Sequence, residues 1–292
     1  MHRIINWNEL WKAIHVASPG RVKKDRDPAA IWDKKAAAYQ KSTRGERRAT
    51  ERDLAFITLS QKDTVLDMGA GTGRLAVPIA GRVSHVTALD ASAEMLKILE
   101  ENMRKEGHSN YTCIRMKWED VVIGRDLEPH DVVIAAFSLG FFDLAAALLK
   151  LDAAARRAVY LFWHAGEWRG KEEMDLYRAV FGQQGAMKKG YPDYIFPLNI
   201  LHDAGIYANA RVYPATWETA YESVEEAVES WVSLHCPGLS DTRPVKEFFT
   251  RVLHREVPDG PLVYRAIRPT AVIWWEKENV QAGSSQLPST DP

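Results

Sequence analysis

The pattern of apolar and polar positions changes character once along the chain, near Asp63. Before that point apolar residues recur at helical spacing, as in Ile4, Trp7, Trp11 and Ile14. A three- to four-residue period is typical of amphipathic helices, so we expect helices over Ile4–His15, from Pro28 through Tyr39, and from Arg47. The proline at the start of the second helix favours a first-turn position.

After Asp63, short apolar runs alternate with amphipathic stretches. This alternation is typical of βαβ units and predicts an α/β fold with a mostly parallel sheet. Pro78 lies inside the first helix of this region and should kink that helix or delay its regular part. The predicted strands are Thr64–Met68, His85–Leu89, Thr112–Met116, Asp131–Ala136 and Ala158–Trp163, and the predicted helices are Arg74–Gly81, Ala93–Gly107 and Leu144–Ala155.

The alternation weakens after Trp163. A Pro-Asp-Gly-Pro run at 258–261 marks a turn before the final strand, and the last residues, rich in Ser, Gln and Pro, predict a disordered tail. The elements expected in this region are helices at Glu172–Phe181, Leu198–Ala204, Val224–Ser233 and Pro244–Leu253, a loop at Gly182–Gly190, and strands at Tyr207–Tyr213 and Arg265–Trp275.

Composition excludes several classes of protein. The 292 residues carry a net charge of −1, which offers no overall attraction for nucleic acid or an anionic membrane. Two cysteines do not make a disulfide framework and favour a reducing, cytoplasmic compartment. The polar residues among the first twelve interrupt the apolar region that a signal peptide needs. The apolar stretch Val132–Leu149 contains Asp143 and changes composition midway, so we interpret it as a strand, a loop and a helix rather than a membrane span.

A glycine-rich turn follows the first strand of the alternating region, with Gly69, Gly71 and Gly73 at alternate positions. Glycine there lets a ligand approach the backbone. A phosphate-binding P-loop would end in Gly-Lys-Ser/Thr, but Arg74 follows the last glycine. A dinucleotide fingerprint would need a glycine at that same position, which counts against it without excluding it. An adenosyl ligand without pyrophosphate fits better, because the carboxylate of Asp67 can orient an ammonium group.

A second acidic residue, Asp90, ends the next strand about twenty residues later, a separation at which a carboxylate reaches ribose hydroxyls. Ser92 behind it is a suitable N-cap for the following helix. An acidic residue at the position of Asp90 is expected for both a dinucleotide and an adenosyl ligand.

These two stretches, Val65–Gly73 and Leu89–Leu96, together resemble the class I S-adenosylmethionine-dependent methyltransferases. The resemblance covers about Asp63 to Trp163 and implies a doubly wound, seven-stranded sheet whose final strand runs antiparallel. It also implies that the three glycines pass under the cofactor, that Asp67 orients its methionine end and that Asp90 takes its ribose. The segment Lys117–Asp120 corresponds to the adenine edge, where Glu119 or Asp120 would take the amino group. The expected cofactor-binding residues are Asp67, Gly69, Ala70, Gly71, Gly73, Asp90, Ala91, Met95, Trp118, Glu119 and Phe137.

Methyl transfer from a sulfonium needs alignment more than a charged catalyst, so no particular acid or base is required. His164, just past the fifth strand, is the best candidate for a catalytic group, because open α/β sheets place ligands at the carboxyl ends of their strands. Trp32 and Tyr39 on the second helix are expected to form a lid over the substrate, and Ser138 after the fourth strand to contact it. Asp143 is expected to cap its helix. The histidines and Cys236 show no metal-ligand spacing, so no metal is expected.

The sequence thus predicts a methyltransferase that uses S-adenosylmethionine. A small-molecule acceptor is favoured over a protein side chain, and the fourth strand lacks the Asp/Asn-Pro-Pro-aromatic signature of DNA amino methyltransferases. An NAD-dependent oxidoreductase and a non-catalytic cofactor-binding protein remain alternatives, and a homodimer stays open. The expected organisation is an N-terminal helical lid at 1–60, an α/β domain at 61–280 with an insertion at 164–205, and the tail at 281–292.

Overall fold

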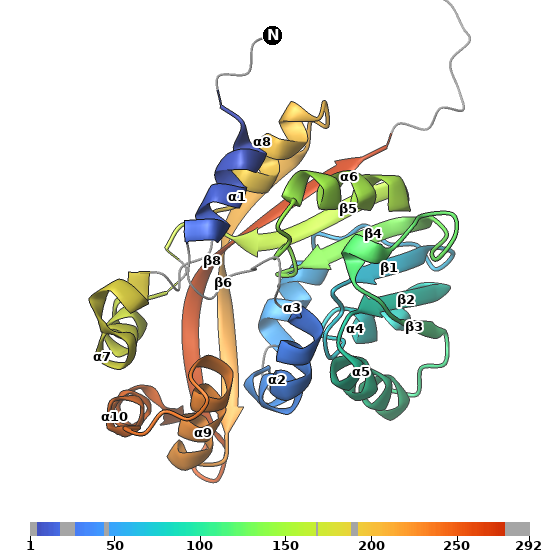
Figure 1. Ribbon diagram of the computed structural model, residues 1–292. Coiled ribbons are helices and arrows are strands. Elements are labelled where there is room, and N and C mark those ends of the chain that lie inside the picture. Colours follow the sequence, from blue (N-terminus) through green and yellow to red (C-terminus); the bar gives the residue numbers. More distant parts are fainter. Residues whose placement is uncertain (1–4, 18–26, 44–46, 168, 188–191, 278–292) are drawn as a thin grey trace, which may run out of the picture.

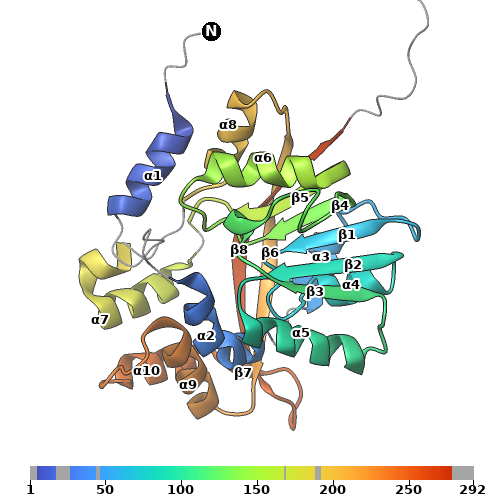
Figure 2. The ribbon, with the colours of Figure 1, turned by 45° about the vertical axis from the view of Figure 1, so that its right-hand side comes forward.

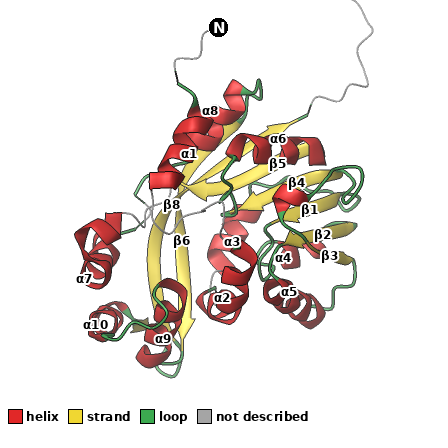
Figure 3. Ribbon diagram, viewed as in Figure 1, coloured by secondary structure: helices red, strands yellow, loops and turns green. Residues whose placement is uncertain are grey.

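The computed structural model describes residues 5–17, 27–43, 47–167, 169–187 and 192–277. Its centre is one sheet with the strand order β3-β2-β1-β4-β5-β8-β6 (Figures 1 and 3). The strands β1 to β5 run parallel, and β8 pairs antiparallel with both β5 and β6. The strand bounds are β1 Thr64–Met68, β2 His85–Asp90, β3 Tyr111–Arg115, β4 His130–Ala136, β5 Ala155–His164, β6 Asn209–Tyr221, β7 His254–Arg255 and β8 Leu262–Glu276.

The predicted α/β fold with an antiparallel final strand is confirmed. The seven expected strands are joined by an eighth, the two-residue β7, which pairs with β8 off the main path. The helices are α1 Trp7–Ala17, α2 Pro28–Ser42, α3 Arg47–Leu54, α4 Ala76–Ala80, α5 Ala93–Lys105, α6 Leu144–Ala154, α7 Lys171–Met187, α8 Ile195–Asp203, α9 Val224–His235 and α10 Arg243–Val252.

The central strands β1, β2, β4 and β5 are buried on both faces, as their near-continuous apolar sequences require, whereas β3 and much of β6 are more exposed. Residues alternate between two cores: Leu66 and Met68 face one with α6 and α8, while Val65 faces the other with α4 and α5. The expected delay at Pro78 is confirmed, because α4 begins only at Ala76 and is five residues long. The predicted N-caps are confirmed as well, since Ser92 Oγ accepts from Met95 N at 3.2 Å and Asp143 Oδ1 from Ala146 N at 3.0 Å.

The antiparallel strands β6 and β8 run past the rest of the sheet as a long ribbon (Figure 1). Although α9, α10 and β7 lie between them in sequence, we call this pair of strands the hairpin. The predicted strand ended at Tyr213, but β6 continues through Pro214 to Tyr221. The extension carries a third apolar core, formed with α7, α9 and α10 and separate from the two that cover the sheet. Its buried residues are Leu176, Tyr177, Tyr221, Ala227, Trp231, Val245, Phe248 and Phe249. The sequence patterns predicted these helices but not this separate core.

The expected insertion at 164–205 is divided in the structure. Helix α7 packs against α10 in the third core, whereas α8 packs on the opposite side against α6 and α1 (Figure 2). The predicted loop at 182–190 is also wrong in part, because Gly182 has a non-helical φ of 70° yet helix resumes as far as Met187.

The N-terminal helices are likewise divided. Trp11 of α1 is fully buried, and its Nε1 donates to the carbonyl of Phe141 at 2.8 Å, so α1 belongs to the core beside α6 and α8. Helix α2 instead lies between α5 and α9. Helices α1 and α2 therefore do not pack as one unit, and the helical lid expected from residues 1–60 stays a prediction. Ile4 and the predicted tail lie outside the described residues.

Within the described residues, no helix combines the length and the apolar character needed to cross a membrane. The stretch 132–149 consists of strand β4, a loop and helix α6, as predicted.

Candidate active site at the carboxyl edge of the sheet

The glycine turn folds back onto the end of β2. The backbone N–H groups of Gly69 and Ala70 both donate to the carbonyl of Leu89, at 2.8 and 3.1 Å. Gly69 has a φ of +73°, and a Cβ built there would lie 2.4 Å from the Cβ of Ser138. The turn therefore requires glycine at this position for both conformation and space.

Asp90 holds the turn in place. One carboxylate oxygen accepts from the N–H of Gly71 and the other from the N–H of Ser92, each at 2.9 Å. Burial raises the pKa of Asp90, and these two hydrogen bonds oppose the shift. The carboxylate lies beside the turn, as expected from the sequence.

Asp67 lies beneath the turn with only 3% of its surface exposed. Burial raises its pKa to about 7; Arg74 opposes the shift, Asp90 adds to it, and the N–H of Ala76 donates a stabilising hydrogen bond. A cation placed against this carboxylate would favour its charged form. The site therefore matches a ligand with an ammonium group.

Arg74, which follows the turn directly, joins three distant parts of the chain. Its Nη1 donates to Asp53 Oδ2 of α3 at 2.7 Å, and Asp53 Oδ1 accepts from the hydroxyl of Tyr213 on β6 at 2.6 Å. The guanidinium lies 5.8 Å from the ring centre of Phe137 and 5.5 Å from that of Trp217. The turn, α3 and β6 are thus fixed to one another.

The loop after β4 forms the next part of the edge. Phe137 has a φ of +56°, which is uncommon for a residue other than glycine. Ser138 Oγ donates to the carbonyl of Met68 at 2.8 Å, so this hydroxyl links β4 to β1. A direct hydrogen bond from Ser138 to a substrate would have to replace that link.

His164 at the end of β5 is 5% exposed, and its ring centre lies 5.1 Å from that of Phe137. Burial lowers the pKa of His164 to about 3, with further lowering from Arg169 and Arg268. The imidazole is therefore neutral near pH 7.

Helix α2 crosses the carboxyl edge on the side of the glycine turn. Asp33 Oδ1 accepts from Ser92 Oγ at 2.5 Å and from the N–H of Glu94 at 3.2 Å. The Tyr39 ring would lie 3.8 Å from a Cβ on Gly71. Trp32, 42% exposed, packs edge-on against Tyr39 with ring centres 5.7 Å apart. Tyr39 and, through it, Trp32 thus stand next to the glycine turn.

The segment after β3 is more closely packed than expected. The indole of Trp118 is buried, and its Nε1 donates to the carbonyl of Ala147 at 3.2 Å. Lys150 Nζ donates to the carbonyls of Trp118 and Glu119, while the Glu119 side chain is exposed. The Trp118 side chain thus belongs to the core, and contact with an adenine would fall to its backbone or to Glu119.

Comparison with known proteins accounts for this arrangement. A family model described as "Methyltransferase domain" matches residues 65–157. The chain is 30% identical over 258 residues to an uncharacterized protein from Haemophilus influenzae, covering 87% of this chain and 91% of that one. It is also 31% identical over 90 residues to a malonyl-[acyl-carrier protein] O-methyltransferase from Marinomonas sp., covering 30% of this chain and 33% of that protein.

Residues 65–157 form a methyltransferase domain, and the chain is an S-adenosylmethionine-dependent methyltransferase.

Among solved structures, the methyltransferase is similar to an S-adenosylmethionine-dependent methyltransferase from Aquifex aeolicus, at 22% identity and a TM-score of 0.48, covering 65% of this chain and 94% of that one. Because residues 65–157 match a methyltransferase domain, the methyl donor is S-adenosylmethionine, and the interpretation as an oxidoreductase is set aside.

Most of the predicted site residues of the methyltransferase lie along the carboxyl edge, and Ala91 and Met95 lie at the start of α5 behind it. The structure brings Asp67, the glycine turn, Asp90, Tyr39, Phe137, Ser138 and His164 together along the carboxyl edge. Met95 is buried in the first turn of α5, where its N–H bonds to Ser92, and Ala91 links Asp90 to that cap. Their roles in cofactor binding remain predictions.

Sequence reasoning missed Asp53, Tyr213, Trp217 and Arg268, which also reach this edge. They come from α3 and from the hairpin, and no motif joins them to the glycine turn. Arg74 was noticed only as a residue that breaks the dinucleotide pattern.

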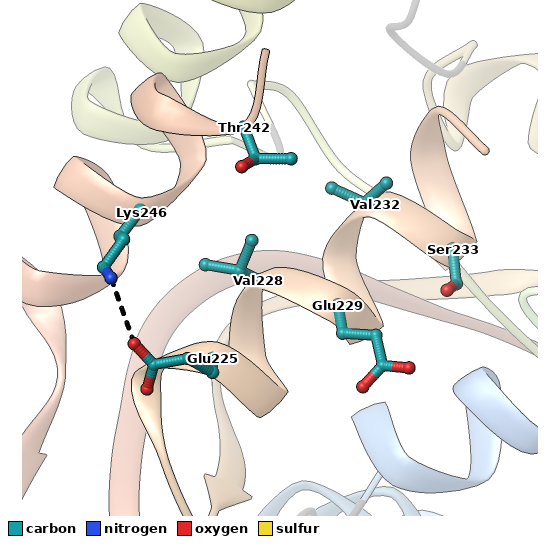
Figure 4. Close-up of a pocket in the computed structure, with 7 residues that line it drawn as sticks. All are labelled: Glu225, Val228, Glu229, Val232, Ser233, Thr242 and Lys246. Atoms are coloured by element: carbon teal, nitrogen blue, oxygen red, sulfur yellow. Dashed lines mark ion pairs between the residues drawn. The ribbon is translucent and has the colours of Figure 1, made fainter. Parts of the chain in front are cut away.

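An open groove of about 420 Å³ lies between α9 and α10, lined by Val228, Val232 and the Glu225–Lys246 pair (Figure 4). No residue of the carboxyl edge lines it, so we do not assign it to the reaction. Among the described residues, no group of three or more His, Cys, Asp or Glu side chains is placed to hold a metal ion.

Proposed function

We propose that this methyltransferase methylates a small molecule, bound at the carboxyl ends of β4 and β5. The observation that supports this is the burial of the edge beyond the glycine turn. His164 is 5% exposed, and both α2 and the hairpin with its third core flank that region (Figure 1). A folded protein or a nucleic acid would need a more open approach to reach these residues.

The residues of the turn fit the donor. We assign the Asp67 carboxylate to the ammonium group of S-adenosylmethionine, the Asp90 carboxylate to its ribose hydroxyls, and the three glycines to the backbone surface beneath it. Asp90 can accept a further hydrogen bond, because its two oxygens offer about four acceptor sites and the backbone N–H groups of Gly71, Ser92 and Ala91 occupy at most three. The bound donor supplies an electrophilic methyl group on a sulfonium.

The acceptor side needs to align a nucleophile with that methyl group and to exclude water. The ring of Phe137 packs there against both His164 and Trp217, with ring centres 5.1 and 5.2 Å from its own. A neutral imidazole can accept a hydrogen bond from the acceptor. With a pKa of about 3, however, His164 is a weak base, so we assign it a positioning role before an acid-base one.

We retain α2 as the lid. It contacts the donor side through Asp33 and Tyr39, and it reaches the third core through Lys35, whose Nζ donates to the carbonyl of Leu234 on α9 at 2.5 Å. Movement of α2 would therefore expose donor and acceptor together.

Calorimetry tests the donor assignments. S-adenosylhomocysteine should bind, NAD should not, and Asp90→Ala should weaken S-adenosylhomocysteine binding about ten- to hundredfold, since hydrogen bonds to charged groups contribute about 1.5–3 kcal/mol. The matched control is Asp126→Asn, in an exposed pair with Arg125. Unchanged binding by Asp90→Ala would contradict the assignment.

A labelled donor tests the acceptor. Incubation with a lysate should place labelled methyl groups in the small-molecule fraction. Label found only in protein would replace this proposal with side-chain methylation, and binding without label anywhere would favour a non-catalytic role.

A further inference from the structure

A buried polar cluster lies next to His164 on the side away from the donor. We call it the Arg268 cluster; its members are His164, Arg169, Glu173, Tyr177, Tyr264 and Arg268. His164 pairs in register with Thr270 of β8, and the N–H of Ala165 donates to the carbonyl of Pro269 at 3.1 Å. Arg268 is two residues from Thr270 and so lies on the same face of the strand.

The centre of the cluster is a guanidinium that holds a carboxylate with both arms. Arg268 Nη1 and Nη2 each donate to an oxygen of Glu173 at 2.8 Å, and the two side chains are only 11% and 13% exposed. Tyr264 also hydrogen-bonds to Glu173, and burial, followed by that carboxylate, raises the Tyr264 pKa. This geometry is the two-pronged arrangement by which arginine recognises carboxylates.

A second guanidinium belongs to the same place. That of Arg169 lies 4.2 Å from the ring centre of Tyr177, and both Arg169 and Arg268 lower the pKa of His164. The nearby carboxylate of Asp193 is directed elsewhere, toward the N–H groups of Gly166 and Ile195. The cluster thus brings two cations to the end of β5.

Charge is therefore segregated along the carboxyl edge. The donor side carries the carboxylates of Asp33, Asp67 and Asp90, which suit a cationic donor. Beyond the Phe137 ring lie the neutral His164 and the cluster, in which the two cations Arg169 and Arg268 outnumber the one carboxylate of Glu173, while Arg74 between the two regions is balanced by Asp53. An acceptor of opposite charge to the donor would complement this distribution.

We propose that the acceptor is a small carboxylate-bearing molecule, and that its carboxylate pairs with Arg268 in exchange for Glu173, with Arg169 adding attraction. This inference rests on the proposed small-molecule function. The carboxylate serves recognition, and the methylated atom lies elsewhere in the acceptor. We favour a carboxylate over a phosphate because Arg268 already holds a planar carboxylate, that of Glu173, by both of its oxygens.

Two variants separate recognition from structural support. Arg268→Met with Glu173→Met removes both charges, so no buried charge is left unpaired, and the protein should fold and bind S-adenosylhomocysteine. It should nevertheless bind the acceptor about ten- to hundredfold more weakly. Glu173→Gln removes the internal competitor and leaves the guanidinium, so the KM for the acceptor should fall. A purely structural pair would give unchanged acceptor KM in the double variant and a raised one in Glu173→Gln.

In the closing experiment the full chain is incubated with labelled S-adenosylmethionine and a lysate, the mixture is then ultrafiltered, and the filtrate is divided on an anion exchanger. The label should enter the fraction that the anion exchanger retains, and the labelled product should still be retained after phosphatase treatment. The amount of label in that fraction should fall about ten- to hundredfold with the double variant. Label in the unretained fraction, or a labelled product that is no longer retained after phosphatase treatment, would contradict a carboxylate-bearing acceptor while leaving the proposed function intact. Label only in the macromolecular retentate, or in no fraction despite S-adenosylhomocysteine binding, would overturn the proposed function itself.

Discussion

The Cβ of Ser138 occupies the space that a side chain on Gly69 would need, at a distance of 2.4 Å. Because Ser138 Oγ also bonds to the carbonyl of Met68, the serine cannot move away without loss of that link. The loop after β4 thus fixes the glycine turn after β1.

We expect Gly69→Ala to lower the free energy of unfolding by about 2–5 kcal/mol, from about 1–2 for the left-handed backbone and about 1–3 for the overlap. The control is Gly107→Ala, which has a similar φ of +75° but no atom within 4 Å, and should cost only the first term. Urea unfolding measures both. Adding Ser138→Gly to Gly69→Ala should restore part of the loss; equal costs for the two single variants would refute the steric argument.

The raised pKa of Asp67, about 7, predicts pH-dependent donor binding. Its proton must leave before the carboxylate can pair with an ammonium group, so S-adenosylhomocysteine should bind about tenfold more tightly at about pH 8 than at about pH 6. Calorimetry in buffers of different ionisation enthalpy should detect proton release. Asp67→Asn should bind weakly with no such dependence over this range, and an identical pH profile in that variant would exclude Asp67.

The lowered pKa of His164 predicts that the free energy of unfolding decreases at acid pH. Its folded-state pKa of about 3 lies below the unfolded value of about 6.5, so its contribution is present above the unfolded value and is lost as pH falls. Between about pH 8 and about pH 5 this loss amounts to about 2 kcal/mol. His164→Phe should flatten the pH dependence of urea unfolding, with the exposed His254→Phe as control. Parallel curves for His164→Phe and the parent protein would contradict the assignment. His130, whose pKa burial also lowers, should leave some residual slope.

The Arg74–Asp53 pair should be strongly coupled. Its side chains are 11% and 1% exposed, so Asp53→Asn or Arg74→Met should each destabilise the fold by about 3–5 kcal/mol, because each leaves a buried partner uncompensated. The double variant should lose less than the sum of the two. The Arg178–Asp175 pair, whose side chains are 45% and 52% exposed, offers the matched cycle, with an expected coupling of about 0–1 kcal/mol. Additive losses at Arg74 and Asp53 would show that the pair is not a unit.

Much of the donor side could be predicted because its signals are local. The bounds of β1 were predicted without error, since a short apolar run there ends in glycine. The parallel order then places Asp67, Asp90 and Phe137 at one edge, because the carboxyl ends of parallel strands meet there.

The acceptor side could not be predicted in the same way. Pro214 suggests a strand end, and the predicted strand stopped before it, yet Pro214 faces Pro269 of β8 at a position where neither has an N–H to contribute to the ladder. Strand β6 therefore continues past Pro214, and Trp217 reaches the site only through this continuation. Arg268 lay inside the predicted last strand, but its partner is far away in sequence: Glu173 is 95 residues from Arg268.

Helix α1 shows the same limit. Its apolar stripe predicted the helix correctly, but a stripe does not say what it covers. Trp11 packs into the core beside Phe141, whereas Tyr39 of α2 lies next to the glycine turn.

The long hairpin has a consequence for how such an enzyme could be altered. Tyr221 and Leu262 are paired across β6 and β8, so the segment between them leaves and re-enters the fold at one point. Replacing residues 222–261 with a short turn, or with the corresponding segment of a relative, would remove β7, α9 and α10 but preserve the pairing of β1 to β6 and β8. The α9–α10 part of the third core is in this sense an exchangeable segment, which faces α7 and α2 and could be varied while the parallel strands that carry the glycine turn are inherited unchanged.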